Sequence, residues 1–254
     1  MILVQDVYDY VNQLAPFDTQ EPWDNSGLLV GDGSSKVEKI LCALDATNSV
    51  IHEAEEVGAN LIVTHHPVIF NPLKKLCFEH PVYQAVQKGI HIICAHTCLD
   101  KADGGVNDCL VKALDLKNVR KCDDPLGLLR MGELDREYSL NEFLAYVGDK
   151  LNLEGIKYTP TEKNIKNVAV CGGSGAEFYE SAFQMGADAY ITADIKHNYF
   201  IEFRDMGLCV LDASHFCTEN VVIKPLAEKL SNQFKEIEVL CSKVSKDPAY
   251  YWTK

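Results

Sequence analysis

Short apolar runs alternate with stretches of helical period along most of this chain, and no other feature limits its fold as much. In the first half, three runs have the composition of strands: 39–45, 61–66 and 91–97. Three further stretches have the period of helices: 49–59, 80–89 and 104–116. Consecutive strands that are joined by helices are typical of parallel sheets. The sequence therefore predicts an α/β fold with mostly parallel or mixed sheets flanked by helices.

The second half of the chain repeats this alternation. Strands are expected at 166–173, 189–194, 208–214 and 236–241, and helices at 139–151, 176–187, 199–207 and 219–230. Between the halves, residues 121–134 contain Pro125, Gly127 and Gly132, which interrupt regular elements. We therefore expect two similar α/β lobes, residues 1–124 and residues 125–254.

Composition disfavours several classes of partner. The 254 residues carry a formal net charge of −13, so nucleic-acid phosphates would be repelled on average. No apolar run approaches the ~18 residues that a membrane span needs. The first residues include Asp6 and Asp9 but no basic segment, unlike a secretory signal. We therefore expect a cytoplasmic protein without a membrane or nucleic-acid partner, whose ten cysteines are reduced thiols.

The pair His65-His66 ends one of the apolar runs, directly before Pro67. Adjacent residues of a regular strand point to opposite faces, so both imidazoles can serve one site only where the strand ends. Pro67 predicts such an end because it has no backbone N–H to donate. Functional groups gather at the carboxyl ends of parallel strands. The pair is therefore a candidate site, although two histidines of a surface loop are an equally good interpretation.

Two further strand ends carry residues of the types that bind metal ions. His96 lies near the end of one run, and Asp100 follows it four residues later. His215 and Glu219 follow another run, and their spacing of four residues would place both side chains on the same face of a helix. We expect the three strands to be neighbours, which would bring together His65, His66, His96, Asp100, His215 and Glu219. These are too many ligands for one tetrahedral zinc, and they suit two divalent ions ~3.5–4 Å apart. Taken alone, Glu219 also fits an ordinary acidic residue in the first turn of a helix.

Six motifs, in order along nearly the whole chain, resemble the NGG-one-interacting-factor-three-like family: WDNSGLLVG (23–31), IVTHHP (62–67), HTCLDKADGGVND (96–108), GLLRMGEL (127–134), AYITADIKH (189–197) and SHFCTE (214–219). The resemblance implies that two metal ions are held by His65, His66, Asp100, His215 and Glu219. It also implies a two-lobed subunit in a toroidal homohexamer, without the central domain that some longer relatives insert. Members are often named as homologues of a type of GTP cyclohydrolase I.

Two classes of function remain open from the sequence. A metal-dependent hydrolase would use the ions to activate water, and His96 and His197 are its candidate catalytic residues for proton transfer. Its unknown small-molecule substrate would be a phosphoester, a nucleotide or a cyclic amide. A non-catalytic protein of metal trafficking or regulation would instead load and release the ions. Imidazole and carboxylate ligands accept zinc, iron, manganese or cobalt.

Three weaker candidates lie elsewhere in the chain. The segment 172–175 (GGSG) has backbone amides that could hold an anion, although a tight turn is the favoured interpretation. Asp194 and His197 follow a predicted strand end and could contact ligands or substrate. Residues 24–26 (Asp-Asn-Ser) belong to a family motif and equally suit a turn or a helix cap.

Overall fold

The computed structural model of the chain describes residues 1–252 and contains two compact units, each built from two separate stretches of sequence. Unit 1 comprises Met1–Gly105 and Val222–Lys246. Unit 2 comprises Val106–Val221 and the described residues from Asp247 onward. This division differs from the expected one after residue 124. Residues 106–124 belong to the second unit, and residues 222–246 return to the first.

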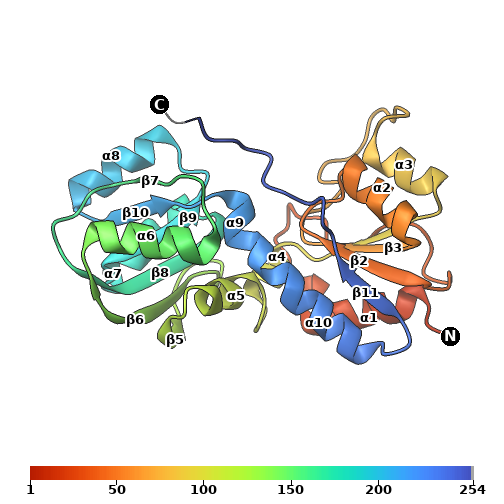
Figure 1. The fold of residues 1–254 in the computed structure, drawn as a ribbon, viewed down its shortest axis with the longest axis horizontal. Helices are drawn as coiled ribbons and strands as arrows, with labels where there is room; N and C mark the ends of the chain where they lie inside the picture. The colour runs from red at the N-terminus through yellow and green to blue at the C-terminus, as the bar shows by residue number, and fades with distance from the viewer. Residues whose placement is uncertain (253–254) are drawn as a thin grey trace. The chain divides into compact units, whose positions relative to one another are not determined.

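Unit 1 is built on a five-stranded sheet (Figure 1). Its strands lie in the order β1 (Gly27–Val30), β4 (His91–Cys94), β3 (Leu61–Thr64), β2 (Lys39–Ala43) and β11 (Glu238–Cys241). All neighbours in this order are parallel except β1 and β4, which are antiparallel. The sheet is therefore mixed, as the fold-class prediction allowed.

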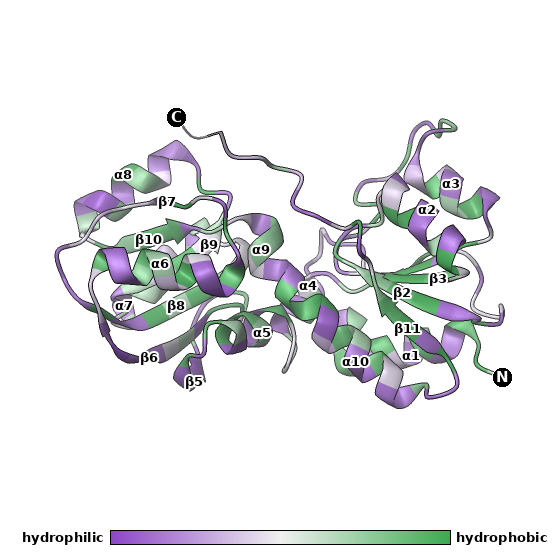
Figure 2. Ribbon diagram, in the orientation of Figure 1, coloured by the Kyte–Doolittle hydropathy of each residue, from purple (hydrophilic) through white to green (hydrophobic). Residues whose placement is uncertain are grey.

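Helices cover both faces of this sheet. Helices α2 (Asn48–Val57) and α3 (Pro81–Gln87) lie on one face, and α1 (Val4–Leu14) and α10 (Ile223–Gln233) lie on the other (Figure 1). Because both faces are covered, the central strands are apolar along their length, as Figure 2 shows for β2 and β3. Strand β3 is buried at all four of its residues. A short helix, α4 (Thr97–Lys101), follows β4 directly.

Unit 2 is built on a six-stranded mixed sheet. Its strands lie in the order β5 (Lys117–Lys121), β6 (Arg130–Tyr138), β8 (Ile165–Ser174), β9 (Ala189–Ala193), β10 (Cys209–Asp212) and β7 (Lys157–Tyr158). Strands β8, β9 and β10 are parallel, whereas β5, β6 and β7 pair antiparallel to their neighbours. Mixed sheets were allowed by the fold-class prediction, but β5, β6 and β7 were not among the expected strands, and β6 begins inside the segment 121–134 that was expected to be a break.

Two apolar cores cover the faces of this second sheet. Helices α5 (Val106–Ala113) and α6 (Leu140–Leu151) supply Leu110, Phe143 and Val147 to one core. Helices α7 (Tyr179–Gln184) and α8 (His197–Met206) supply Ala182 and Phe203 to the other.

Local signals in the sequence explain where several helices begin. Ser139 caps α6, and its N–H and hydroxyl both donate to Glu142, at 2.9 and 2.7 Å. The expected helix 219–230 is divided into α9 (His215–Glu219), a 3₁₀ turn (Asn220–Val222) and α10. Pro225 is then the third residue of α10, where its missing N–H removes no helical hydrogen bond.

Within the described residues, no helix combines the length and the apolar character that crossing a bilayer requires.

Candidate functional site

The carboxyl ends of β3 and β4 bring predicted site residues together in unit 1. The two strands are parallel neighbours, with Thr64 opposite Cys94, so the residues that follow them leave the same edge of the sheet. The expectation that these two strands are neighbours is confirmed. Strand β10, which precedes His215, lies in the other sheet beside β9 and β7. The expectation that all three strands are neighbours is therefore wrong, because the fold assigns the third to unit 2.

The first ligand cluster consists of His65, His66 and His96. One ring nitrogen from each of these histidines lies within 4.8 Å of those of the other two. In each ring Nδ1 contacts an oxygen acceptor: the carbonyl of Ala95 for His65 (3.0 Å), Asp45 for His66 (2.7 Å) and Asp24 for His96 (2.8 Å). Carbonyls and carboxylates accept hydrogen bonds, so each neutral ring carries its proton on Nδ1 and keeps its lone pair on Nε2. Proteins orient metal-binding imidazoles in this way.

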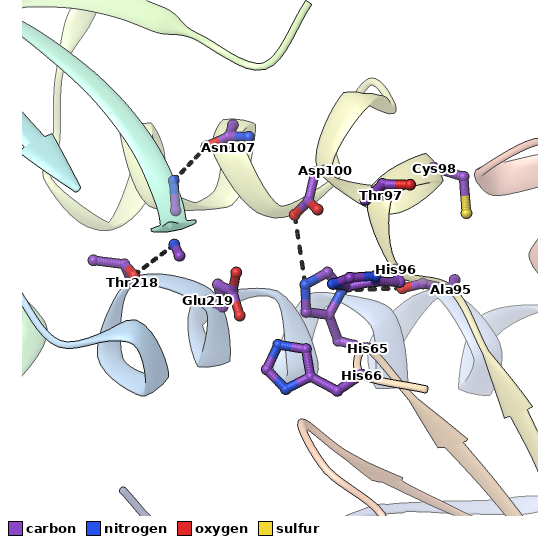
Figure 3. A network of polar contacts seen from close by, with 12 residues as sticks. His65, His66, Ala95, His96, Thr97, Cys98, Asp100, Asn107, Thr218 and Glu219 are labelled. Atoms are coloured by element: carbon purple, nitrogen blue, oxygen red, sulfur yellow. Dashed lines mark hydrogen bonds and ion pairs between the residues drawn. The ribbon is translucent and has the colours of Figure 1, made fainter. Parts of the chain in front are cut away.

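Asp100 adds a carboxylate to the first ligand cluster. Helix α4 directs the side chain of Asp100 toward His65 (Figure 3), and Oδ1 lies 3.5 Å from Nε2 of that ring. His65 is fully buried and Asp100 is 8% exposed. A buried carboxylate is costly unless a cation or several donors compensate it. Imidazole nitrogens next to such a carboxylate are a donor set that fits a divalent metal ion.

Asp24 orders the loop that carries His96. Its Oδ2 accepts hydrogen bonds from the N–H and the hydroxyl of Thr97, while Oδ1 accepts from the ring of His96. Burial raises the pKa of Asp24, but the hydrogen bonds from His96 and Thr97 outweigh that effect and lower it well below its usual value. Ser26 accepts from the N–H of His96 at 3.0 Å. The motif at residues 24–26 therefore positions a candidate site residue, which its turn-or-cap interpretation did not include.

The second ligand cluster lies in unit 2, after the parallel neighbours β9 and β10. It comprises Asp194, which follows β9, and His215 and Glu219, which begin and end α9. Nδ1 of His215 lies 2.7 Å from Asp194, and Nε2 lies 2.9 Å from Glu219. The two residues of α9 share a helix face, as their spacing predicted. Burial lowers the pKa of His215, but the hydrogen bonds to Asp194 and Glu219 outweigh it and raise the pKa to about 10.

Unusual backbone conformations support the second ligand cluster. Asp194 has φ 53° and Ser214, the residue before His215, has φ 61°. Such conformations cost about 1–3 kcal/mol each for residues with a Cβ, and they concentrate at functional sites. The hydroxyl of Ser214 caps α9 by accepting from the N–H of Cys217. The turn that aims His215 is therefore held by specific contacts.

The glycine segment 172–175 serves this second ligand cluster. The N–H groups of Gly172 and Gly173 donate to Asn107 and Thr218, at 2.8 and 3.0 Å (Figure 3), and that of Gly175 donates to Thr192. These donors are used within the protein, so the anion-binding interpretation is not supported. Gly173 has φ 63°, and a Cβ there would lie 2.0 Å from Oε1 of Glu219. The glycine thus lets the strand pass close beside the carboxylate.

Two positions stand apart from the predictions. His197 is exposed at the first residue of α8, and among the described residues it belongs to no group of converging ligand atoms. Its role in proton transfer stays a prediction. Asp45, which contacts His66, was not singled out from the sequence. The available signal was its place after β2, the parallel neighbour of β3.

Comparison with known proteins gives consistent results. The sequence model of Duf34/NIF3 (NGG1p interacting factor 3) matches residues 2–248. A Clostridium perfringens protein named GTP cyclohydrolase 1 type 2 homolog is 33% identical over 256 residues, covering 96% of this chain and 98% of that protein. The crystal structure of Staphylococcus aureus hypothetical protein SA1388 aligns with a TM-score of 0.94 at 30% identity, covering 99% of both chains. A Bacillus cereus protein related to NIF3 shares the fold, with a TM-score of 0.93 at 22% identity over 98% of this chain and 99% of its own.

Proposed function

The chain belongs to the Duf34/NIF3 family, and we propose that it is a metal-dependent hydrolase that binds two divalent ions. The proposed ligands are His65, His66, Asp100, His215 and Glu219. One observation carries the proposal: three histidines (His65, His66 and His96) each place Nδ1 against an oxygen acceptor, which leaves Nε2 as the ligand atom, while His215 has Nδ1 against Asp194 and Nε2 2.9 Å from Glu219. Asp100 and Glu219 lie beside two of these rings as buried carboxylates.

Bound divalent ions would lower the pKa of a coordinated water and polarise a substrate oxygen. The protein's own residues set the conditions for this chemistry. Three of the rings donate their Nδ1 protons to carboxylates, those of Asp45, Asp24 and Asp194. Because these rings are already oriented, little free energy is needed to orient them when an ion binds. The substrate we propose is a phosphoester, a nucleotide or a cyclic amide, all of which present an oxygen to a metal ion.

His96 is the residue we propose to move protons. Its Nδ1 proton is held by the carboxylate of Asp24, which fixes the orientation of the ring and leaves Nε2 as the atom that would take up or release a proton. The ring is also close enough to His65 and His66 to act as a further ligand. Substitution of His96 by Asn distinguishes the two roles. Loss of turnover with unchanged metal content supports proton transfer, and loss of metal supports ligation.

The proposed hydrolase is tested by turnover of phosphoesters and nucleotides in chelator-treated protein that has been reloaded with zinc, manganese, iron or cobalt. We expect activity only after reloading, and its loss in His66→Ala and Glu219→Gln. His52→Ala is the matched control, because His52 is an exposed residue of α2. Activity that survives both ligand substitutions contradicts the proposal. Metal binding without turnover of any substrate favours the non-catalytic alternative of trafficking or regulation.

We also propose the homohexamer that the family resemblance implies. Light scattering of the purified protein should then give a mass six times the 28.3 kDa of the chain. A monomer mass at micromolar concentration would contradict this assembly.

A further inference from the structure

Two exposed aromatic side chains lie next to His96 in unit 1. Trp23 is 56% exposed and Phe70 is 46% exposed. Their ring centroids lie 6.1 and 6.2 Å from that of His96, and 5.9 Å from each other. Single exposed aromatic residues are common, but two beside a polar cluster form a local apolar surface. We name this pair, Trp23 and Phe70, the aromatic wedge.

Hydrogen bonds connect the segments that carry the aromatic wedge. Trp23 precedes Asp24, whose carboxylate is bonded to His96 and Thr97. Asn25 donates from its side chain to the carbonyl of Ile69 at 2.6 Å, one residue before Phe70. The two rings are thus presented by backbone segments that are tied to each other and to the histidine loop. This arrangement suits a binding surface better than an accidental exposure of apolar rings.

The geometry of the wedge indicates what it would bind. The planes of Trp23 and Phe70 meet at 49°, so a planar ligand can lie flat on one ring while its edge meets the other. His96 presents its ring edge-on to both, at 71° and 77°. A flat ligand on the wedge would therefore have a polar, proton-bearing neighbour at one side. Planar aromatic and heteroaromatic rings fit such a surface best, because they can stack on one π face and meet the other ring with an edge.

We propose that Trp23 and Phe70 form a subsite that stacks the planar nitrogen heterocycle of a small-molecule substrate, such as a purine-like ring. The proposal deepens the proposed function, because it names the substrate class for the site that contains His96. The stacked ring supplies binding energy, and its substituents extend toward His96 and the first ligand cluster.

The test uses the fluorescence of Trp23. The chain has two tryptophans, Trp23 and Trp252, so Trp252→Phe leaves Trp23 as the only reporter. This protein is freed of metal with a chelator and titrated with adenosine, and in parallel with ribose, which lacks the ring. We expect saturable quenching by adenosine and none by ribose. Phe70→Ala in the same background should weaken adenosine binding about 5-fold or more, the effect of removing one stacking partner.

Phe78→Ala is the matched control. Phe78 is also exposed and also pairs with an aromatic ring, that of Tyr83 at 5.0 Å. Its loss should leave the titration unchanged. Phe70→Leu keeps apolar volume without a π face, and it should bind adenosine as weakly as Phe70→Ala. This variant guards against an effect of misfolding, which far-ultraviolet circular dichroism would also reveal.

The proposal is overturned if adenosine produces no saturable quenching, if ribose quenches equally, or if Phe70→Leu binds like the parent. Because the titration is made without metal, its outcome is separate from that of the proposed hydrolase. Stacking of adenosine without metal-dependent turnover would support the aromatic subsite and contradict the hydrolase. Metal-dependent turnover without stacking would support the hydrolase and contradict the aromatic subsite.

Discussion

The two ligand clusters are built in the same way but from different side chains. In unit 1 the cluster follows β3 and β4, and in unit 2 it follows β9 and β10, each a pair of parallel neighbours. The first ligand cluster has three imidazoles and the buried carboxylate of Asp100. The second has one imidazole, that of His215, between the carboxylates of Asp194 and Glu219. The first cluster is therefore dominated by imidazoles and the second by carboxylates.

The clusters also differ in how the backbone supports them. The second ligand cluster needs three residues with positive φ nearby, Gly173, Asp194 and Ser214. The histidines of the first follow their strands with only one residue of positive φ, Gly89, between Gly58 and Gly104. The second cluster should therefore be the more sensitive to substitution.

The largest expected effect comes from Gly173→Ala. The new Cβ would lie 2.0 Å from Oε1 of Glu219, in addition to the cost of a positive φ. We expect the free energy of unfolding to fall by at least ~2 kcal/mol, with loss of metal at the second cluster. Denaturant titration and metal analysis of the variant measure both.

Gly186→Ala separates the two causes of that effect. Gly186 has a similar positive φ of 82°, but a Cβ there would meet nothing within 4 Å. Gly186→Ala should lower the free energy of unfolding only by the ~1–2 kcal/mol of backbone strain, and it should leave metal binding unchanged. Equal losses for the two glycine variants would show that the contact with Glu219 is unimportant.

An intermediate effect is expected from the acids that hold the rings. Asp194→Asn removes the charge opposite His215, while asparagine still tolerates the left-handed backbone. Loss of such a partner typically weakens metal affinity ~10–100-fold. Asp45→Asn makes the same change at His66, where two other imidazoles lie nearby, and should cost less. Zinc titration by calorimetry compares them, and a larger loss in Asp45→Asn would reverse the ranking of the clusters.

The last prediction concerns the change in the pH dependence of stability when one partner of His215 is removed from the metal-free protein. The pKa of His215 is raised to about 10, because the hydrogen bonds to Asp194 and Glu219 outweigh the burial that would lower it. A raised pKa contributes stability that is complete below the unfolded value of about 6.5 and is lost as the pH rises through about 10. Glu219→Gln removes one of these partners and should shift the loss to lower pH. Chemical denaturation between pH 6 and pH 10.5 measures this, and identical profiles would contradict the charged character of the second cluster.

The sequence predicted local features well and long-range ones poorly. The end of β3 before Pro67, the capping box at Ser139 and the shared helix face of His215 and Glu219 all depend on residues close in sequence. The assignment of residues 222–246 to unit 1 depends on β11 pairing with β2, nearly 200 positions earlier in the chain, which no local pattern encodes. The expected lobe boundary after residue 124 therefore differs from the division of the chain into two compact units.

Within the two ligand clusters, the histidines, Asp24, Asp100, Asp194 and Glu219 were singled out from the sequence, whereas Asp45 and the contact made by Gly173 were not. Asp45 and Gly173 have no unusual pattern of their own. Their importance appears only when β2 lies beside β3 and when β8 passes beside Glu219. A rule that inspects acids after every parallel strand would have found Asp45, but the contact made by Gly173 required the folded backbone.

The most direct test of the account is the number of metal ions that each chain binds. Protein stripped by a chelator, reloaded with zinc and freed of excess ion should contain two ions per chain by elemental analysis. His66→Ala and Glu219→Gln, each changing one ligand cluster, should both contain fewer, while His52→Ala keeps two. Wild-type protein that retains no ion, or both ligand variants retaining two, would contradict the claim that these clusters hold the metal.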